Sequence, residues 1–401
     1  MRKKTLLVLA AGSLQVPAIT VAKRMGLRVV AADGNPKAPG LVLANAAHVI
    51  DITNPQACLE VARSERVDGV IHICSEVAMA SLGLINQELG LAGPDSETVV
   101  RATNKEQMRR AFEEGGAPSP TSIAVATEHA ALAAAAFIDG PMIVKPSRNS
   151  GSRGITFVPA MASANLLKAA FNHAMAESRD RAALVEQYVE GPEFSVEALI
   201  WRGRTEILAL TDKLTTGQPH FVEMGHSQPT LLKAQDAIKV REAAILGIRA
   251  LGLDGCAAHA EVKLSSDGPY LMEIGARLGG DFITTELVPR STGVDMVAGA
   301  IRICLGEEPD LKPKHEPRGV AIRYLAPAPG KVVRVSGVEE ALRQSGVKVV
   351  ELYVSSGDIV GQVNSSRARS GHVIAEGLTV EEAVENAERA RECVKPVISP
   401  V

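Results

Sequence analysis

Apolar and polar residues alternate along the first hundred positions in blocks that predict strands followed by helices. Residues 5–11 form a short, almost continuous apolar run, as expected for a buried parallel strand. Residues 15–25 then carry Val16, Ile19 and Ala22 at the spacing of one helical face. This order of elements predicts a doubly wound α/β domain. The pattern continues through expected strands at 27–33, 48–52 and 67–73 and an expected helix at 55–64.

The chain beyond residue 100 changes in character. A helix is expected at 104–114, and the glycines and prolines at 115–120 end it. A smaller unit with strands at 121–125 and 142–146 follows, and we expect it to form a lid.

Two pairs of long strands then predict antiparallel hairpins, and a final group of strands with one helix predicts a small α+β unit. The hairpins are expected at 194–201 with 206–212 and at 258–264 with 270–276. Residues 312–317, rich in lysine and proline, are typical of a linker. The expected domains are 1–102, 103–310 with a lid at about 117–190, and 311–401.

Composition narrows the class of protein. The chain has 401 residues, enough for two or three packed domains. Its formal net charge of -3 argues against general affinity for nucleic acid or for a membrane surface. The five cysteines are scattered without a CxxC pair, which favours a reducing cytoplasm. No apolar stretch of about 18 residues predicts a membrane span, and the apolar start continues directly into strand and helix patterns.

A loop rich in glycine, serine and arginine follows the apolar strand that ends near Lys145. Glycines in such a loop let backbone N–H groups approach phosphates, and a lysine supplies the balancing charge. The alternative is a basic surface turn. The GxxxxGK[ST] pattern is absent, which excludes a P-loop. The candidate phosphate-binding residues are Lys145, Ser147, Gly151, Ser152 and Gly154.

The second expected hairpin carries one carboxylate on each strand, Glu261 and Glu273, with Arg277 just beyond. Two inward carboxylates on neighbouring strands can bind one metal ion, and Mg²⁺ prefers oxygen ligands that it shares with ATP phosphates. The alternative is a pair of solvated glutamates. Glu273 lies between Met272 and Ile274 in an otherwise apolar strand, which favours the metal site.

A third stretch, residues 184–200, could hold the nucleoside. A strand edge at 186–189 can contact adenine through main-chain groups, and a carboxylate after the Gly-Pro turn can bind ribose hydroxyls. The candidates are Glu186, Gln187, Val189 and Glu193.

These three stretches, in this order, resemble the ATP-grasp superfamily over nearly the whole chain. Residues 33–51 resemble the pre-ATP-grasp domain of purine-pathway carboxylases and glycinamide ligases, and 350–360 with 371–387 resemble their C-terminal domain. The run HFVEMGHSQPT at 220–230 resembles a loop of ATP-grasp ligases that join amino acids. The resemblance implies an ATP-grasp fold between a doubly wound N-terminal domain and a small α+β C-terminal domain.

The resemblance also implies roles for individual residues. Lys105 and Lys145 would bind phosphates, Ser152 would belong to the mobile loop, and Lys145 and Arg277 would be catalytic. Glu186 to Val189 would contact adenine, Glu193 ribose, and Glu261 and Glu273 magnesium, with Mn²⁺ as a substitute. Many family members have asparagine where this chain has Gly275, which leaves a third metal or phosphate contact open. Glu223, His226, Arg277 and Arg323 would border the substrates.

The implied activity is ligation driven by ATP. A carboxylate would be activated as an acyl phosphate, with release of ADP and phosphate, and joined to an amine, forming a C–N bond. The expected partners are these small molecules and a second copy of the chain, without nucleic acid or membrane. The alternatives are a non-catalytic or regulatory ATP-binding subunit and a purine-pathway carboxylase or formyl/glycinamide ligase. A dehydrogenase is disfavoured because the first turn, AAGSLQVP, lacks GxGxxG.

Overall fold

The N-terminal unit is a parallel sheet with helices on both faces. The computed structural model describes residues 2–148, 153–178 and 180–400, and its four N-terminal strands follow the order β3-β2-β1-β4. Side chains of β1 alternate: Leu6 and Val8 pack with α1, whereas Leu7 and Leu9 pack with α2 and α3. The predicted doubly wound layout is confirmed. Its elements are β1 (Thr5–Leu9), α1 (Val16–Arg24), β2 (Arg28–Asp33), η1 (Leu41–Leu43), β3 (Ala46–Val49), α2 (Pro55–Glu65), β4 (Gly69–Ile71) and α3 (Met79–Leu89).

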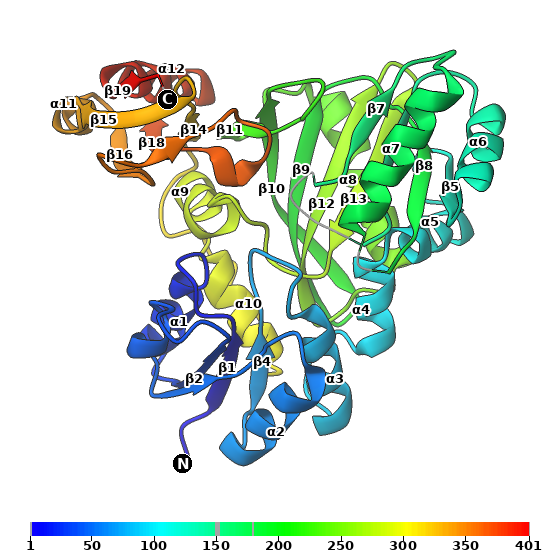
Figure 1. The fold of residues 1–401 in the computed structure, drawn as a ribbon. Helices are drawn as coiled ribbons and strands as arrows, with labels where there is room; N and C mark the ends of the chain where they lie inside the picture. The colour runs from blue at the N-terminus through cyan, green and yellow to red at the C-terminus, as the bar shows by residue number, and fades with distance from the viewer. Residues whose placement is uncertain (1, 149–152, 179, 401) are drawn as a thin grey trace.

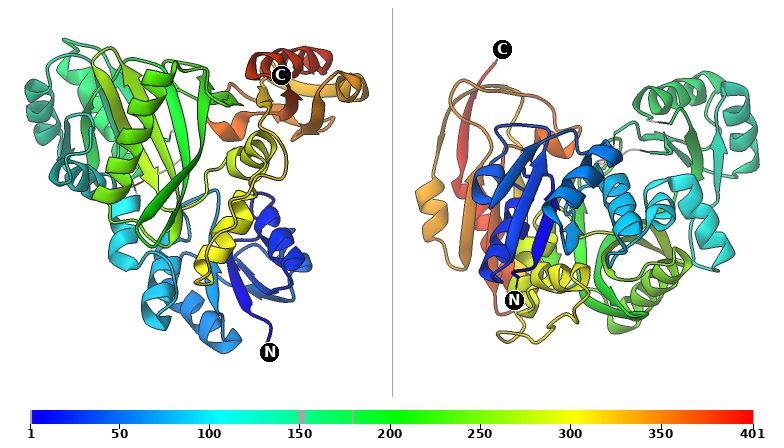
Figure 2. Two further views of the ribbon diagram at one scale, coloured as in Figure 1. Left: turned by 180° about the vertical axis from the view of Figure 1, so that it is seen from behind. Right: turned by 90° about the horizontal axis from the view of Figure 1, so that it is seen from below.

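Two short helices, α4 (Ser96–Thr103) and α5 (Lys105–Glu114), lead to the unit that was predicted to form a lid and that keeps this name below. Asn104 separates them because its side chain accepts a hydrogen bond from Gln107 N, which caps α5. The lid is a four-stranded sheet of order β5-β8-β6-β7 with two helices on one face. It lies at the opposite side of the molecule from the C-terminal elements (Figure 1, Figure 2). Its elements are β5 (Ser122–Val125), α6 (Glu128–Phe137), β6 (Met142–Pro146), β7 (Thr156–Val158), α7 (Ala164–Glu177) and β8 (Ala183–Gln187).

An eight-stranded antiparallel sheet of order β13-β12-β9-β10-β11-β14-β18-β16 spans the rest of the molecule. One face of its first strands packs on α8 and α5, and α10 covers one end of the opposite face. The two predicted hairpins are confirmed as β9–β10 and β12–β13. The strands are β9 (Glu193–Trp201), β10 (Arg204–Thr215), β11 (Glu223–Gln228), β12 (Cys256–Ser265), β13 (Gly268–Gly275), β14 (Gly319–Leu325), β16 (Val347–Leu352) and β18 (Gly371–Gly377). The helices are α8 (Ala234–Ala250), η2 (Ile283–Leu287), α9 (Val288–Thr292) and α10 (Met296–Cys304).

The C-terminal elements share this large sheet, because β14 pairs with β11 and brings β18 and β16 with it. A second, three-stranded sheet of order β17-β15-β19 lies beside it. The additional elements are β15 (Gly330–Ser336), α11 (Val338–Arg343), β17 (Ile359–Val360), η3 (Ser366–Ala368), α12 (Val380–Cys393) and β19 (Lys395–Ser399). Among the described helices, none has the length and apolar character needed to cross a bilayer.

Gly247 lets α8 approach the sheet closely. A Cβ atom at this position would lie 2.6 Å from Ile274 Cδ1 and 2.6 Å from Leu271 Cδ1, inside the packed core. Because interiors are close-packed, a larger side chain here must push the helix away from β13.

We therefore expect Gly247→Val to lower the free energy of unfolding by about 1–3 kcal/mol. Urea denaturation of the full chain measures this change. Ala234→Val, at an exposed position in the first turn of the same helix, controls for the β-branched side chain. Equal effects of the two substitutions would show that contact with the sheet is not the cause.

Candidate functional site

The candidate site lies on the face of the large sheet opposite α8. Glu261 on β12 pairs directly with Glu273 on β13. Their neighbours Ala260, Val262 and Ile274 are buried in the core on the α8 side, so the two carboxylates point together to the other face. The part of this sheet face that α10 does not cover carries charged side chains.

Each of these carboxylates forms an ion pair with a lysine from a different element. Lys105 Nζ, at the start of α5, lies 2.9 Å from Glu273 Oε2, and Lys213 Nζ, on β10, lies 3.0 Å from Glu261 Oε1. Lys213 also contacts Glu193 and lies 3.6 Å from Glu223. Burial alone would raise the pKa of both carboxyl groups, but the lysines outweigh burial and lower it. The site is therefore a charged cluster in which half-buried carboxylates meet lysines whose side chains are buried.

A second ion cluster joins α5 to the lid. Glu186 on β8 accepts from Arg109 Nε at 2.8 Å and from Lys145 Nζ at 2.6 Å, and its side chain is 1% exposed. Burial would raise the pKa of Glu186, but the two cations hold it at about 2. Burial lowers the pKa of Lys145 to about 8; Glu186 opposes this shift, and Arg109 and Lys105 add to it. Lys145 thus loses its proton at a lower pH than an ordinary lysine.

The start and end of the predicted phosphate loop are described, but Gly151 and Ser152 lie outside the described residues. Ser147 Oγ donates to Asp180, and Ser147 O accepts from Lys105 N at 3.0 Å. Gly154 has φ of +74°, and a Cβ there would lie 2.8 Å from atoms of Pro146 and Glu177. The loop therefore starts beside Lys105 and returns close to the strand that carries Lys145.

The predicted nucleoside residues lie along the end of β8. Val189 O accepts from Lys263 Nζ at 3.2 Å, and the same ammonium lies 5.1 Å from the ring centre of Tyr188. Gln187 N donates to Thr121 O at 2.9 Å. The Glu186 side chain is fully used by Arg109 and Lys145, so its carboxylate is not available to a ligand unless those pairs break.

Arg277 lies next to the carboxylate pair and contacts the N-terminal unit. Its Nη2 is 3.4 Å from Oε1 of Glu76, which follows β4. Burial raises the pKa of Glu76 to about 7, the nearby Glu273 adds to the rise, and Arg277 opposes it. The N-terminal unit therefore supplies one carboxyl group to the site.

The other side of the cluster is formed by β11, β14 and the segment after η3. His226 Nε2 lies 3.5 Å from Asp281 Oδ2, and Arg369 binds both oxygens of Asp281 at 2.6 and 2.8 Å. The Arg369 guanidinium lies 3.7 Å from the ring centre of Tyr324 and donates to Glu223 O at 3.2 Å. His226 and Glu223 are thus brought together with residues of the C-terminal part.

Arg323, predicted to border the substrates, lies on β14 beside the strand that carries His226. His226 pairs with Ile322, so Arg323, one residue further, points to the opposite face of β14. There its Nε lies 2.7 Å from Glu388 Oε1 of α12. Its Nη1 also donates to His226 O at 3.2 Å, so the guanidinium lies between α12 and the backbone of β11. A role of Arg323 at the substrates stays a prediction.

Several site residues were not found from the sequence. Glu76 follows a short strand without any motif, and the lysine on β10 and the arginine on α5 are recognisable only once strand register and helix face are known. The missed residues are Glu76, Arg109, Lys213, Asp281 and Arg369.

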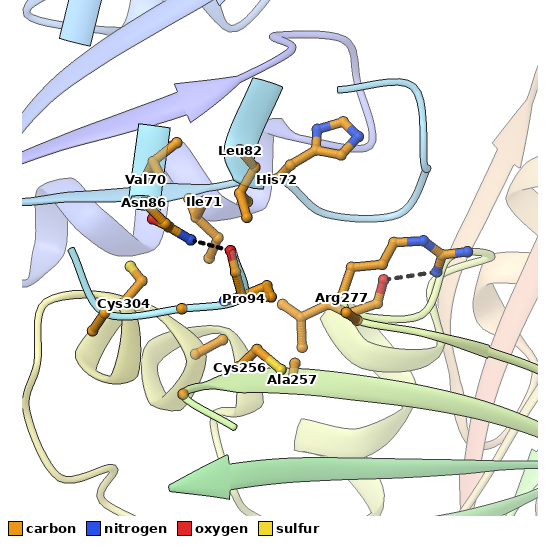
Figure 3. Close-up of a pocket in the computed structure, with 16 residues that line it drawn as sticks. Val70, Ile71, His72, Leu82, Asn86, Pro94, Cys256, Ala257, Arg277 and Cys304 are labelled. Carbon is orange, nitrogen blue, oxygen red and sulfur yellow. Dashed lines mark hydrogen bonds between the residues drawn. The ribbon is translucent and has the colours of Figure 1, made fainter. Parts of the chain in front are cut away.

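A small cavity borders Arg277 on the side of the N-terminal sheet (Figure 3). It has a volume of about 30 Å³ and is lined by Val70 and Ile71 of β4, by Cys256 of β12 and by other mainly apolar side chains. Nucleotide-sized pockets measure roughly 300–1,000 Å³. We therefore assign no substrate to this cavity.

The carboxylate pair fits a magnesium ion by its donor chemistry. Within the described ranges, no group of three or more His, Cys, Asp or Glu side chains comes together as a metal site. Glu261 and Glu273 offer two oxygen donors side by side, and Mg²⁺ usually takes one or two carboxylates and completes its shell with water and substrate phosphates. Ser195 Oγ, which faces Glu261 across the strand pair, is buried without a protein partner in the described part of the chain.

Comparisons with known proteins agree with this geometry. Residues 138–286 match the family model of the ATP-grasp domain, and residues 323–399 match the L-amino acid ligase C-terminal domain 2. The formate-dependent phosphoribosylglycinamide formyltransferase of Burkholderia cenocepacia (strain HI2424) is 30% identical over 409 residues, covering 98% of this chain and 95% of that protein.

Solved structures share the fold over the full length. The L-amino acid ligase from Bacillus licheniformis has a TM-score of 0.84 at 21% identity and is covered completely, as is this chain. Phosphoribosylglycinamide synthetase from Anaerococcus prevotii has a TM-score of 0.80 at 21% identity, with 99% of this chain and 100% of that chain covered.

The chain belongs to the ATP-grasp family. It is an ATP-dependent ligase of the kind that forms C–N bonds, and it binds ATP with Mg²⁺. This identification confirms the predicted class and replaces the alternative of a non-catalytic ATP-binding subunit.

The buried cluster around Glu186 yields a stability prediction. Glu186→Gln keeps the side-chain volume but leaves Arg109 and Lys145 buried without their counter-charge. We expect the free energy of unfolding to fall by roughly 3 kcal/mol, as for other broken buried pairs, measured by urea denaturation. Glu114→Gln, which removes the exposed partner of Arg110, should leave it unchanged. A Glu186→Gln protein as stable as the parent would show that this cluster contributes no net stability.

Proposed function

We propose that this ligase phosphorylates a substrate carboxylate with ATP and joins the resulting acyl phosphate to the amine of an amino acid or a similar compound. The opposed pair Glu261–Glu273, flanked by two buried lysines, carries the proposal. Two metal carboxylates beside cations suit transfer of the terminal phosphoryl group, in which positioning and charge neutralisation do most of the catalysis. The match of residues 323–399 to the L-amino acid ligase domain favours an amino-acid substrate.

In this proposal Lys105 and Lys145 bind the phosphates, Arg277 neutralises the transferring phosphoryl group, and Ser147 and Gly154 belong to the covering loop with Gly151 and Ser152. Glu261 and Glu273 hold Mg²⁺, which supplies charge neutralisation at the phosphates, and Mn²⁺ can replace it. Adenine contacts the main chain at Gln187 and Val189, and Glu193 binds the ribose. Since Glu186 is bound by two cations, its proposed role is to position Lys145.

The acceptor side is proposed to lie between the carboxylate pair and the cluster around His226. Glu223, His226 and Asp281 are gathered there with Arg369. Asp281 neutralises the charge of Arg369 because both of its oxygens bind the guanidinium. An arginine paired in this way binds a substrate phosphate more weakly than an unpaired arginine would. This pairing favours an amine without a phosphate group.

A purine-pathway substrate is the second candidate. It is supported by the 30% identity to a formate-dependent phosphoribosylglycinamide formyltransferase over nearly the full length of both chains. Formate with a phosphoribosyl amine would then replace the amino-acid pair, and the products of the experiment below separate the two.

We further propose domains at 1–102, 103–310 and 311–401, a cytoplasmic location and a homodimer. All five cysteines are unpaired, which fits a reducing compartment. A structural neighbour, the biotin carboxylase domain of Hydrogenobacter thermophilus 2-oxoglutarate carboxylase, is described as a dimer. Its fold matches this chain with a TM-score of 0.77.

The order of chemical steps follows from the proposed roles. The substrate carboxylate attacks the γ-phosphorus of ATP, the bond to the β-phosphate oxygen breaks, and ADP leaves. The amine then attacks the acyl carbon, and phosphate departs. Lys105, Lys145 and Arg277 offset the charge of the transferring group, and the lid excludes water that would hydrolyse the acyl phosphate.

A product assay tests this function. Purified protein is incubated with MgATP and a panel of carboxylates, including amino acids and formate, each with and without amines. We expect ADP and phosphate in equal amounts, and with the correct acid but no amine, hydroxylamine should trap a hydroxamate. AMP as the stoichiometric nucleotide product would contradict the acyl-phosphate route. Turnover with formate and a phosphoribosyl amine would select the second candidate.

The lowered pKa of Lys145, about 8, predicts a pH dependence of nucleotide binding. Below this pH the side chain is a charged ammonium group, which attracts the phosphates. Above it the amine is neutral, so nucleotide binding must be accompanied by uptake of a proton from the solvent. Affinity for MgATP should therefore fall between pH 8 and 9.5, by up to about tenfold per pH unit, in calorimetric titrations. Lys145→Arg, which stays charged, should show a flatter profile whatever its absolute affinity. Parallel profiles for the two proteins would rule out Lys145 as the titrating phosphate ligand.

A further inference from the structure

A buried acid–imidazole pair lies on the polar face of the sheet, outside the residues assigned above. Glu197 on β9 pairs in register with His259 on β12, and Glu197 Oε1 lies 2.5 Å from His259 Nδ1. Glu197 is fully buried and His259 is 8% exposed. Burial of two polar groups is unfavourable unless they form hydrogen bonds, so the presence of this pair calls for a structural or functional explanation.

His259 also reaches the proposed metal ligand. It precedes Glu261 by two residues on the same strand, so both side chains point to the same face. Its Nε2 lies 3.5 Å from Glu261 Oε1, the oxygen that Lys213 contacts at 3.0 Å. The imidazole therefore lies between two carboxylates, and each ring nitrogen faces one of them. The ring therefore links Glu197 to Glu261.

The surrounding backbone leaves room for this ring. A Cβ at Gly279 would lie 2.6 Å from His259 Nδ1 and 2.9 Å from Glu197 Oε2. Gly275, directly opposite His259 in the strand pair, has no side chain to compete for the same face. It is also the position at which the family resemblance leads one to expect asparagine.

We propose that the Glu197–His259 pair is a positioning device that fixes the orientation of Glu261 as a metal ligand. The inference rests on the proposed role of Glu261. Ligand carboxylates are commonly oriented by a hydrogen-bonded outer shell. In this chain Glu197 of β9 and His259 of β12 form that shell. On β13 the opposite position is Gly275, which has no side chain that could contribute to it. His259 acts through Glu261 and touches neither substrate.

The competing explanation is that His259 only neutralises the buried Glu197. Two substitutions separate these roles because they replace different ring nitrogens. The amide nitrogen of asparagine occupies nearly the place of Nδ1, facing Glu197, and that of glutamine nearly the place of Nε2, facing Glu261. A positioning role is preserved better by His259→Gln, and a purely structural role better by His259→Asn.

Direct metal binding gives the readout. Mn²⁺ is titrated into each protein with a saturating, non-hydrolysable ATP analogue, and free Mn²⁺ is measured by electron paramagnetic resonance. We expect His259→Asn to weaken binding by about 10–100-fold and His259→Gln by about threefold or less, in the range seen for outer-shell substitutions. The half-saturating Mg²⁺ concentration for turnover should shift in the same order, with a smaller change in KM for ATP.

Equal losses in the two variants, or tighter binding by His259→Asn, would overturn the proposal. Thermal melting establishes folding, and His129→Gln, at an exposed position of α6, is the matched control. If neither His259 variant folds, Glu197→Gln decides, because it keeps the volume and a hydrogen-bond acceptor. Metal affinity unchanged in that variant would overturn the proposal, and an affinity loss of about tenfold would support it. Glu261→Gln tests the underlying assignment separately: unchanged Mn²⁺ binding there would refute Glu261 as a ligand.

Discussion

The structure depends on pairing buried and half-buried carboxylates with cations that come from separate parts of the chain. Glu186, Glu261 and Glu273 are held by lysines or arginines from α5, from the lid and from β10. An unpaired charge at such depth is strongly unfavourable, so each unit supplies what another needs. The same pairing therefore also gathers the groups that are proposed to bind phosphate.

This arrangement lets ligand binding exchange partners without exposing a charge. In the proposed complex the phosphates of ATP take over Lys105, while Mg²⁺ takes over the carboxylate that Lys105 releases. Lys105 and Glu273 would then each keep an oppositely charged partner, although the partner changes. Such an exchange keeps the electrostatic reorganisation small in a site of low dielectric constant, where misplaced charge is most costly.

Contacts within one hairpin of this site could be predicted from the sequence, whereas contacts between segments far apart in the chain could not. The opposition of Glu261 and Glu273 was predictable because apolar neighbours in each strand reveal which residues share a face. Lys213 was not, because β10 has an irregularity between Ile207 and Ala209 that sets its register against β9. The contact of Arg323 with Glu388 was not predictable either, because β14 is covered on both faces and alternation alone does not say which face a side chain takes.

The domain layout shows the same limit. The N-terminal α/β unit and both hairpins followed from local periodicity, and the resemblance to ATP-grasp proteins supplied their order. The expected C-terminal domain, which follows a proline-rich connection, shares its sheet with the hairpins through β11 and β14, and this pairing was not predicted. Backbone pairing between distant segments leaves no signal in the spacing of side chains.

That shared sheet has a consequence for how the chain can be divided. Removing everything after α10 would strip β14 from β11 and leave an unpaired strand edge beside the proposed acceptor loop. Unpaired edges recruit other strands, so such a fragment would be prone to self-association. It would also lose Arg369, the partner of Asp281. The second and third proposed domains are therefore joined by backbone pairing in one sheet, and exchange of C-terminal parts between relatives would have to preserve the edge geometry of β11.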